Sequence, residues 1–262
     1  MLLLLKALIL GIVEGATEFL PVSSTGHLII VSSFLDYPEA QRAMFEIFIQ
    51  LGAILAVVWH FRADLLDLAG RLPRQAEAQS FVGKVLLAFL PAAAVGFLFH
   101  HAIEEHLFHP RVVAAALIAG GLVLLLIESR KRVVRVEQME RLTWRDAMWV
   151  GIAQVASLFP GVSRAGATIV GGMLAGLSRS AATQFSFYLA LPTVSAASLF
   201  SLLKNLSSLT AGDVAPLTVG FLSAFVSALL VIRVFLAYVQ THDFRAFGYY
   251  RIFVGLLVLV LV

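Results

Sequence analysis

Two polar stretches interrupt an otherwise apolar chain: Glu14-Gly-Ala-Thr-Glu-Phe-Leu-Pro-Val-Ser-Ser-Thr-Gly-His27 and, about 140 positions later, Leu158-Phe-Pro-Gly-Val-Ser-Arg-Ala-Gly-Ala-Thr168. Together they contain two carboxylates, a histidine, an arginine and several hydroxyls, with prolines that end helices. Ionisable groups at membrane depth are costly, so we expect both stretches to be functional.

The composition indicates an integral membrane protein. Of 262 residues, 60% are hydrophobic and 13% are charged, whereas soluble domains carry about 25% charged residues. The chain has no cysteine, which excludes disulfides and thiolate metal sites. The net charge of +3 does not indicate nucleic-acid binding, because the basic residues lie in loops between apolar segments. The apolar start lacks a basic leading segment, so we do not expect a removable signal peptide.

The lengths of the apolar runs predict six crossings and four half-spans. A crossing helix needs roughly 20 apolar residues, and a run of about 10–14 suggests a re-entrant segment. The predicted crossings are 43–61, 81–100, 111–128, 181–201, 216–239 and 247–262. The predicted half-spans form two hairpins, 2–19 with 24–35 and 144–158 with 163–177, each joined by a turn that contains proline.

The two halves of the chain resemble each other at an offset of 140. Gly26 falls on Gly166, Leu51 on Leu191 and Arg111 on Arg251. Each half holds one hairpin and three crossings, and an odd number of crossings inverts the second half. The predicted fold is an all-α polytopic membrane protein in a single domain, with inverted repeats at 1–128 and 144–262 and a cytoplasmic linker at 129–143.

The basic residues predict the orientation. With 62–80 and 129–145 in the cytoplasm, most of the 19 Lys and Arg residues fall on that side, Arg251 among them. The opposite side holds only Lys6, Arg42, Arg111 and Lys204, and Arg164 remains within the membrane. Both termini then lie outside the cytoplasm.

The N-terminus of the second helix in each hairpin is suited to bind an anion. Helix N-termini present free N–H groups and a positive dipole end, and a guanidinium suits phosphate oxygens. Arg164 and the hydroxyls therefore predict a phosphate cradle, formed by Ser23, Ser24, Thr25, Ser163 and Thr168. Gln50, in a predicted crossing, contacts either the substrate or the re-entrant backbone. The serines are also good helix caps, a role that can coexist with phosphate binding.

The first stretch adds acidic and basic groups. Glu14 and Glu18 share a helix face at spacing i, i+4. Two carboxylates would repel a phosphate unless a cation intervened, and oxygen ligands suit Mg²⁺ or Ca²⁺. His27 can exchange a proton near neutral pH. These groups together suggest phosphoryl transfer to water.

Both stretches also resemble a known family, the bacterial undecaprenyl-diphosphate phosphatases of the bacitracin-resistance type. The likeness continues through Phe45-Glu-x-x-Ile-Gln-Leu-Gly52 and Phe185-Ser-Phe-Tyr-Leu-Ala-x-Pro192 and covers essentially the whole chain. It implies removal of one phosphate from a C55 polyprenyl diphosphate, which recycles a cell-wall lipid carrier at the outer face of the inner membrane. It also implies dependence on a divalent cation. The family's functional positions match Glu14, Glu18, Ser24, His27, Ser163 and Arg164.

Two positions depart from the family pattern. Ala165 stands where the family usually has serine, and Gln184 where it often has glutamate. The resemblance therefore assigns no role to these two side chains.

The sequence hypothesis is a membrane hydrolase of the bacterial inner membrane, with an active site open to the periplasm and a lipid substrate in the bilayer. Water, His27 or Ser24 could attack phosphorus. Besides the lipid substrate, a second copy of the chain is a candidate partner, in a homodimer. The rival function is a flippase or transporter of a phosphorylated polyprenyl lipid, which inverted repeats with broken helices also fit.

Overall fold

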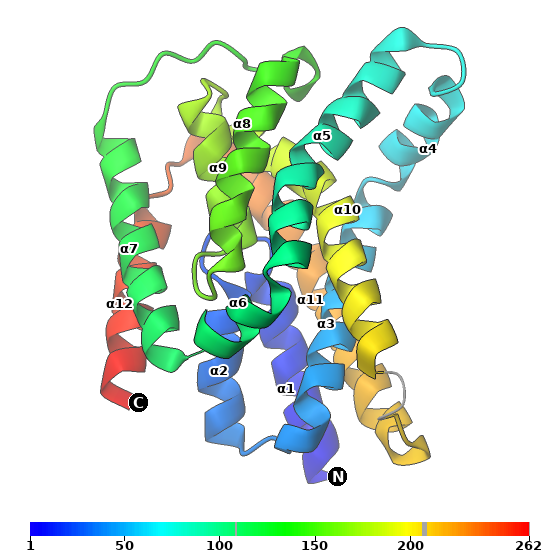
Figure 1. Ribbon diagram of the computed structural model, residues 1–262, viewed down its shortest axis with the longest axis vertical. Helices are drawn as coiled ribbons and strands as arrows, with labels where there is room; N and C mark the ends of the chain where they lie inside the picture. The colour runs from blue at the N-terminus through cyan, green and yellow to red at the C-terminus, as the bar shows by residue number, and fades with distance from the viewer. Residues whose placement is uncertain (108, 206–208, 262) are drawn as a thin grey trace.

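The computed structural model describes residues 1–107, 109–205 and 209–261, and within these ranges the regular structure is helical apart from an isolated bridge between Val136 and Leu177 (Figure 1). The α-helices are α1 (Leu2–Thr17), α2 (Ser24–Leu35), α3 (Glu39–His60), α4 (Arg62–Arg71), α5 (Ala76–Leu98), α6 (His100–Leu107), α7 (Pro110–Ser129), α8 (Trp144–Val155), α9 (Arg164–Leu174), α10 (Arg179–Asn205), α11 (Val214–Thr241) and α12 (Arg245–Leu261). Short 3₁₀ turns cover Met139–Arg141, Ala156–Leu158 and Ala211–Asp213.

The long helices lie where the sequence predicts crossings. Among the described residues, α5, α7, α10 and α11 are long and apolar enough to cross a membrane. A fifth span results if Met44–His60 and Arg62–Arg71, which are bent by 69° at their junction, count as one. The sixth candidate, α12, has 17 residues, fewer than the roughly 20 that a crossing ordinarily needs. The all-helical, polytopic architecture is thus confirmed, and the count of six stays a prediction.

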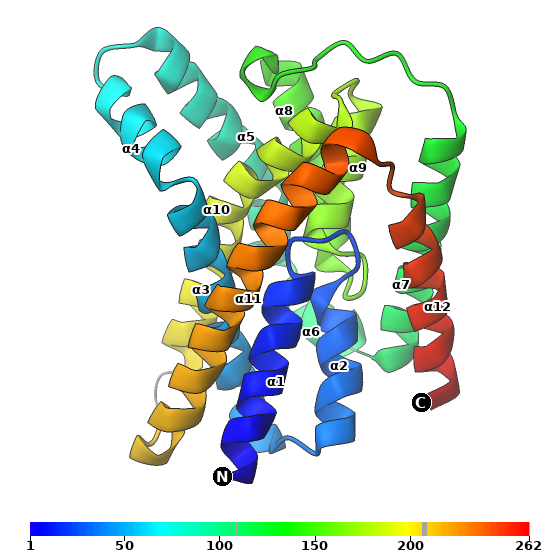
Figure 2. The same ribbon diagram turned by 180° about the vertical axis from the view of Figure 1, so that it is seen from behind.

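Two helical hairpins reach into the middle of the molecule. The pair α1 and α2 approaches from the end that holds the N-terminus, and the pair α8 and α9 approaches from the opposite end (Figures 1 and 2). Their helix boundaries follow the predicted half-spans closely. We call residues 18–23 the first turn and residues 156–163 the second turn.

Small residues bring the first helix of each hairpin close to a long helix of the other half. A Cβ added at Gly15 of α1 would lie 2.3 Å from the Ala224 carbonyl oxygen of α11, and one at Gly151 of α8 would lie 2.6 Å from the Ala88 carbonyl oxygen of α5. Close backbone approach through small residues is typical of helix packing in membranes, where the hydrophobic effect does not drive association.

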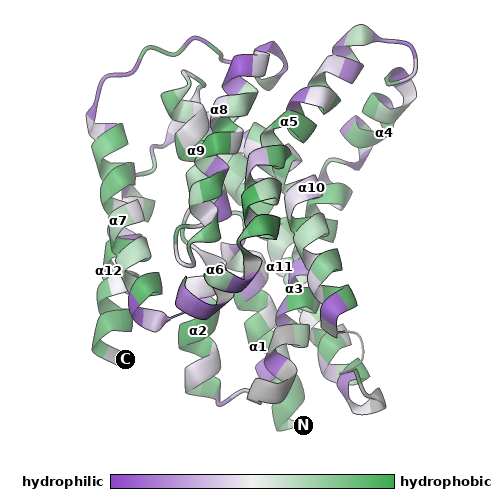
Figure 3. Cartoon of the chain, viewed as in Figure 1, coloured by the Kyte–Doolittle hydropathy of each residue, from purple (hydrophilic) through white to green (hydrophobic). Residues whose placement is uncertain are grey.

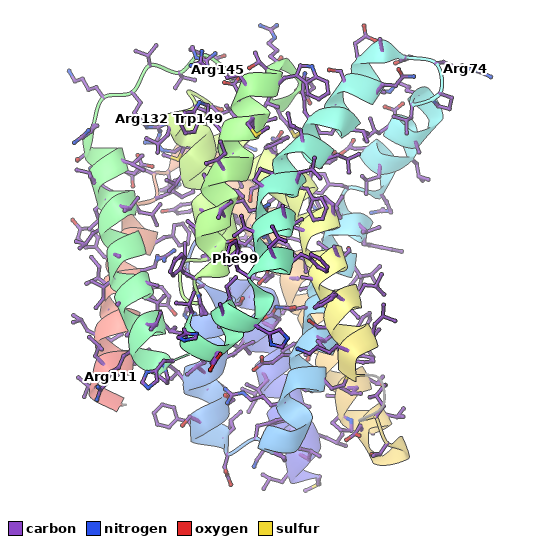
Figure 4. The ribbon with its side chains drawn as sticks, in the orientation of Figure 1. Arg74, Phe99, Arg111, Arg132, Arg145 and Trp149 are labelled. Carbon is purple, nitrogen blue, oxygen red and sulfur yellow. The ribbon has the colours of Figure 1, made fainter. Side chains whose placement is uncertain are left out.

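Polar and apolar residues separate along the molecule. The helices are largely apolar, and hydrophilic residues gather at the α4–α5 turn and along the α7–α8 linker (Figure 3). Arg74, Arg132 and Arg145 lie at one end and Arg111 at the other (Figure 4), and the orientation of these ends in a membrane stays a prediction.

Arg251 corrects the sequence prediction, which placed it with the cytoplasmic loop charges. It lies within α12 and its residue is only 1% exposed, in the protein interior. The prediction was wrong because Arg251 lies close to the start of an apolar run, so the sequence alone reads it as a flank.

Candidate active site

The two turns share one local structure. Ser23 and Ser163 precede α2 and α9 with φ of 69° and 73°. The Ser23 Oγ accepts a hydrogen bond from the Gly26 N–H at 3.4 Å, and the Ser163 Oγ accepts one from the Gly166 N–H at 3.1 Å. Both serines are therefore N-caps, as predicted, and they occupy matching positions in the two halves.

The turns meet at a buried ion pair. An Arg164 Nη2 donates to Glu18 Oε1 at 3.2 Å, and each side chain is 9% exposed. The second carboxylate oxygen of Glu18 accepts a hydrogen bond from Ser24 Oγ at 2.7 Å. Beside them, Ser163 Oγ donates to the Leu20 carbonyl at 3.4 Å. One carboxylate thus joins a hydroxyl of the first hairpin to the guanidinium of the second.

The Arg164 side chain is held in place by α10 and by Phe19. Its Nη1 donates to the Ser186 carbonyl of α10 at 3.1 Å, and the guanidinium lies 5.5 Å from the centre of the Phe19 ring. Thr168 forms a hydrogen bond with the Ser186 hydroxyl at 2.7 Å and is fully buried. Thr168 therefore helps to fix Ser186, which binds Arg164. The structure does not bring Thr168 to the cavity as a phosphate ligand.

A cavity of about 630 Å³ opens over this ion pair. Of the predicted site residues, it is lined by Glu18, Ser23, Ser24, Thr25, Gln50, Ser163 and Arg164. Three further polar residues that the sequence did not single out also line it: Ser157, Thr193 and Ser201. Apolar residues of α5 and α10, from Phe89 to Phe97 and from Val194 to Phe200, form much of the remaining wall. Mixed lining of this kind suits an anionic group attached to an apolar chain.

Besides Thr168, two predicted residues lie outside this lining. Glu14 is fully buried, and neither of its carboxylate oxygens has a hydrogen-bond partner in the described part of the chain. His27 is engaged at both ring nitrogens, Nδ1 with the Ser23 carbonyl and Nε2 with the Tyr250 hydroxyl, each at 2.7 Å. In this arrangement His27 braces the first turn and has no free nitrogen for the cavity.

Of the two acidic residues, only Glu14 has carboxylate oxygens without a hydrogen-bond partner among the described residues, and the predicted divalent cation stays a prediction. Buried polar atoms in proteins are nearly always hydrogen-bonded, so the two unpartnered oxygens of Glu14 leave a place for a cation or a proton. Glu18, one helical turn away, could share a cation with Glu14, and phosphate oxygens and water would complete the ligand set, as is usual for Mg²⁺. The described residues contain no cluster of three or more His, Cys, Asp or Glu side chains for a cation held by the protein alone.

The two departures from the family pattern lie apart from the cavity lining that the structure describes. Ala165 is fully buried in α9. The Gln184 amide donates to Ser180 Oγ at 3.4 Å on α10. Neither side chain takes part in the hydrogen bonds that the structure gives for the side chains of Glu18, Ser24 and Arg164.

The fold and the site define a class, a helical multi-pass membrane protein with a buried polar cavity suited to an anionic headgroup. The chain belongs to the family described as "Bacitracin resistance protein BacA", whose sequence model matches residues 7–257. It is similar to the undecaprenyl-diphosphatase of Nitrosospira multiformis, with 51% identity over 98% of this chain and 94% of that one. It also resembles undecaprenyl-diphosphatase 2 of Rhodospirillum rubrum, with 52% identity over 99% and 95% of the two chains.

Proposed function

We propose that this chain hydrolyses undecaprenyl diphosphate to undecaprenyl phosphate and inorganic phosphate. The contact that carries the proposal is the Glu18 carboxylate, which binds Ser24 of one hairpin and Arg164 of the other at the edge of the cavity. Phosphoryl transfer needs a base, a hydroxyl and a positively charged group held close together, and here the positive group is the Arg164 guanidinium. The apolar walls would accommodate the prenyl chain, and the names of the relatives support the substrate.

Ser24 is the nucleophile that this geometry favours over His27. Glu18 takes the proton from Ser24 Oγ, and Oγ then attacks the distal phosphorus. The bond from that phosphorus to the bridging oxygen breaks, and undecaprenyl phosphate leaves with the electron pair. Water then attacks the phosphorus of the phosphoserine and the bond from that phosphorus to Oγ breaks. Oγ takes back the proton that Glu18 holds, which releases inorganic phosphate and restores the hydroxyl and the carboxylate. Arg164 and the N–H groups at the start of α9 stabilise the charge on the transferred group.

A divalent cation, Mg²⁺ or Ca²⁺, belongs to the proposal. Glu14 and Glu18 would hold it together with phosphate oxygens, and when bound it would polarise the phosphorus centre. The orphaned carboxylate of Glu14 supports this assignment.

We further propose two inverted repeats, 1–128 and 144–262, joined by the linker 129–143, with six crossings and both termini in the periplasm. The matching caps at Ser23 and Ser163 support the repeats. The cavity wall includes Ile103 of α6, the helix that follows the C-terminal end of α5, whereas Arg74 precedes the N-terminal end of α5. This position supports a cavity open to the periplasm. The enzyme would recycle the lipid carrier on that side of the inner membrane.

The test is phosphate release from undecaprenyl diphosphate by the detergent-solubilised protein. Glu18→Gln and Arg164→Ala should each lower the rate by about 100-fold or more, since a general base alone contributes roughly 10²–10⁴-fold. The matched controls are Glu77→Gln and Arg74→Ala, at exposed positions. EDTA should abolish release, and Mg²⁺ or Ca²⁺ should restore it. Wild-type rates in both site variants would refute the assignment.

A flippase or transporter of a phosphorylated polyprenyl lipid is the second candidate. The two hairpins that approach from opposite ends favour it. Movement of the labelled lipid across vesicle membranes without phosphate release would support transport. Phosphate release in detergent, where no membrane barrier exists, would support the enzyme.

A further inference from the structure

Arg251 is the most completely satisfied buried charge near the site. A guanidinium has five N–H donors, and all five of its donor positions are used on backbone carbonyls. Nε donates to Leu117 at 3.3 Å, Nη1 to Pro21 at 3.1 Å and Val162 at 2.9 Å, and Nη2 to Ala116 at 3.2 Å and Gly161 at 3.0 Å.

These acceptors come from three separate parts of the fold. Pro21 belongs to the first turn, Gly161 and Val162 belong to the second turn, and the other two carbonyls belong to α7. One Nη1 atom therefore bridges the two turns directly. A single rigid, planar group fixes the first turn, the second turn and α7 in one arrangement.

The carbonyls that Arg251 binds need such a partner. Turn backbone at membrane depth has unpaired polar groups, which are tolerated only where protein or water satisfies them. Pro21 and Val162 each stand close in sequence to a cap serine, so their carbonyls set the position of Ser23, Ser24, Ser163 and Arg164. A shift of about 1 Å between reacting groups can cost about 10²-fold in rate.

Neighbouring residues leave space for this guanidinium. A Cβ added at Gly120 of α7 would lie 2.1 Å from Arg251 Nη2 and 2.6 Å from its Cζ. Tyr250, the preceding residue of α12, donates or accepts the hydrogen bond that engages His27 of the first hairpin. Adjacent residues of α12 thus contact the first turn, through Arg251, and the helix that follows it, through Tyr250.

We propose that Arg251 is a positioning residue, which aligns the Glu18 and Ser24 side of the site with the Ser163 and Arg164 side by clamping both turns. Arg251 does not line the cavity in the described structure, so it acts through the backbone of the turns. Its effect on turnover rests on the proposed function, whereas its effect on the turns does not.

The experiment compares Arg251→Met and Arg251→Lys with the exposed control Arg245→Met of the same helix. Both Arg251 variants should lose about 100-fold in kcat, because one ammonium nitrogen cannot reach carbonyls on three elements. Rates are measured on monodisperse protein well below the melting temperature of each variant. Wild-type kcat in the folded variants, or full rescue by lysine, would overturn the proposal.

Gly120→Ala keeps Arg251 and guards against a variant that fails to fold. It should displace the guanidinium and lower kcat at least tenfold, whereas Gly70→Ala, at a helix position with no heavy atom within 4 Å of the added Cβ, should not. In the Arg251→Met background Gly120→Ala should cost much less, since the atom it meets is gone. Equal losses in both backgrounds would contradict the proposal.

Hydrogen–deuterium exchange tests whether Arg251 orders the two turns, independently of catalysis. Peptides that cover 17–28 and 158–168 should exchange faster together in Arg251→Met than in the wild-type protein. If wild-type protein released no phosphate, the proposed function would fail. The exchange result would still test whether Arg251 holds the two turns in position. Unchanged exchange in both peptides would refute it.

Discussion

Glu14 and Glu18 show how far residue spacing alone can predict a site. The i, i+4 spacing places both on one face of α1, but Glu18 stands one turn further along, about 6 Å, where the helix ends and the cavity begins. Glu18 therefore meets Ser24 and Arg164, whereas Glu14 stays between packed helices. The two carboxylates have different surroundings, which sequence spacing could not separate.

Substitution of Ser24 and His27 identifies the attacking group. Ser24→Ala should lower the turnover rate by about 10³-fold or more, as expected for loss of a nucleophile. His27→Gln should cost much less, because its ring braces the turn through the Ser23 carbonyl and Tyr250. A phosphoenzyme trapped by acid quench should survive acid, as phosphoserine does. An acid-labile species that persists in Ser24→Ala would identify His27 instead.

At the scale of the helix, the caps of α2 and α9 combine a favourable contact with an unfavourable backbone angle. Ser163 has φ of 73°, a region that favours glycine. Ser163→Ala removes the cap bond and keeps the backbone cost, whereas Ser163→Gly removes the bond and relieves that cost. We expect the Gly variant to melt about 3 °C or more above the Ala variant in detergent. Ser23 should give the same order, and the reverse order at both positions would contradict this account.

The elements show what sequence could predict and what it could not. The hairpins follow from Pro21, Pro160 and the cap serines, because local chemistry decides where a helix breaks. The sequence did not predict α4 and α6, which are short and lie in segments read as loops. It also missed Arg251, because its five acceptors come from residues distant in sequence. Tertiary contacts of this kind leave no periodic signal, and the place of Arg251 near the start of an apolar run makes it look like a flanking charge.

At the scale of the whole molecule, the proposed orientation rests on the charge distribution and on the position of the cavity. Arg74, Arg132 and Arg145 share an end, and basic residues flanking spans favour the cytoplasm (Figure 4). The cavity wall runs along α5 to Phe97 and reaches Ile103 of α6, toward the opposite end, where Arg111 lies in the first turn of α7. A lipid diphosphate would then reach Glu18 and Arg164 from the periplasm.

The absence of cysteine in the chain allows a direct test of this orientation. Single cysteines at Arg74→Cys and Arg111→Cys lie at opposite ends and at exposed positions. A maleimide that cannot cross the inner membrane should label Arg111→Cys in intact cells and Arg74→Cys only after permeabilisation. Partial labelling of both sites in intact cells would indicate two insertion directions. A reversed pattern would place the opening of the cavity in the cytoplasm. Substrate released outside could not reach that opening without prior transport. The result would favour the flippase alternative over the periplasmic phosphatase.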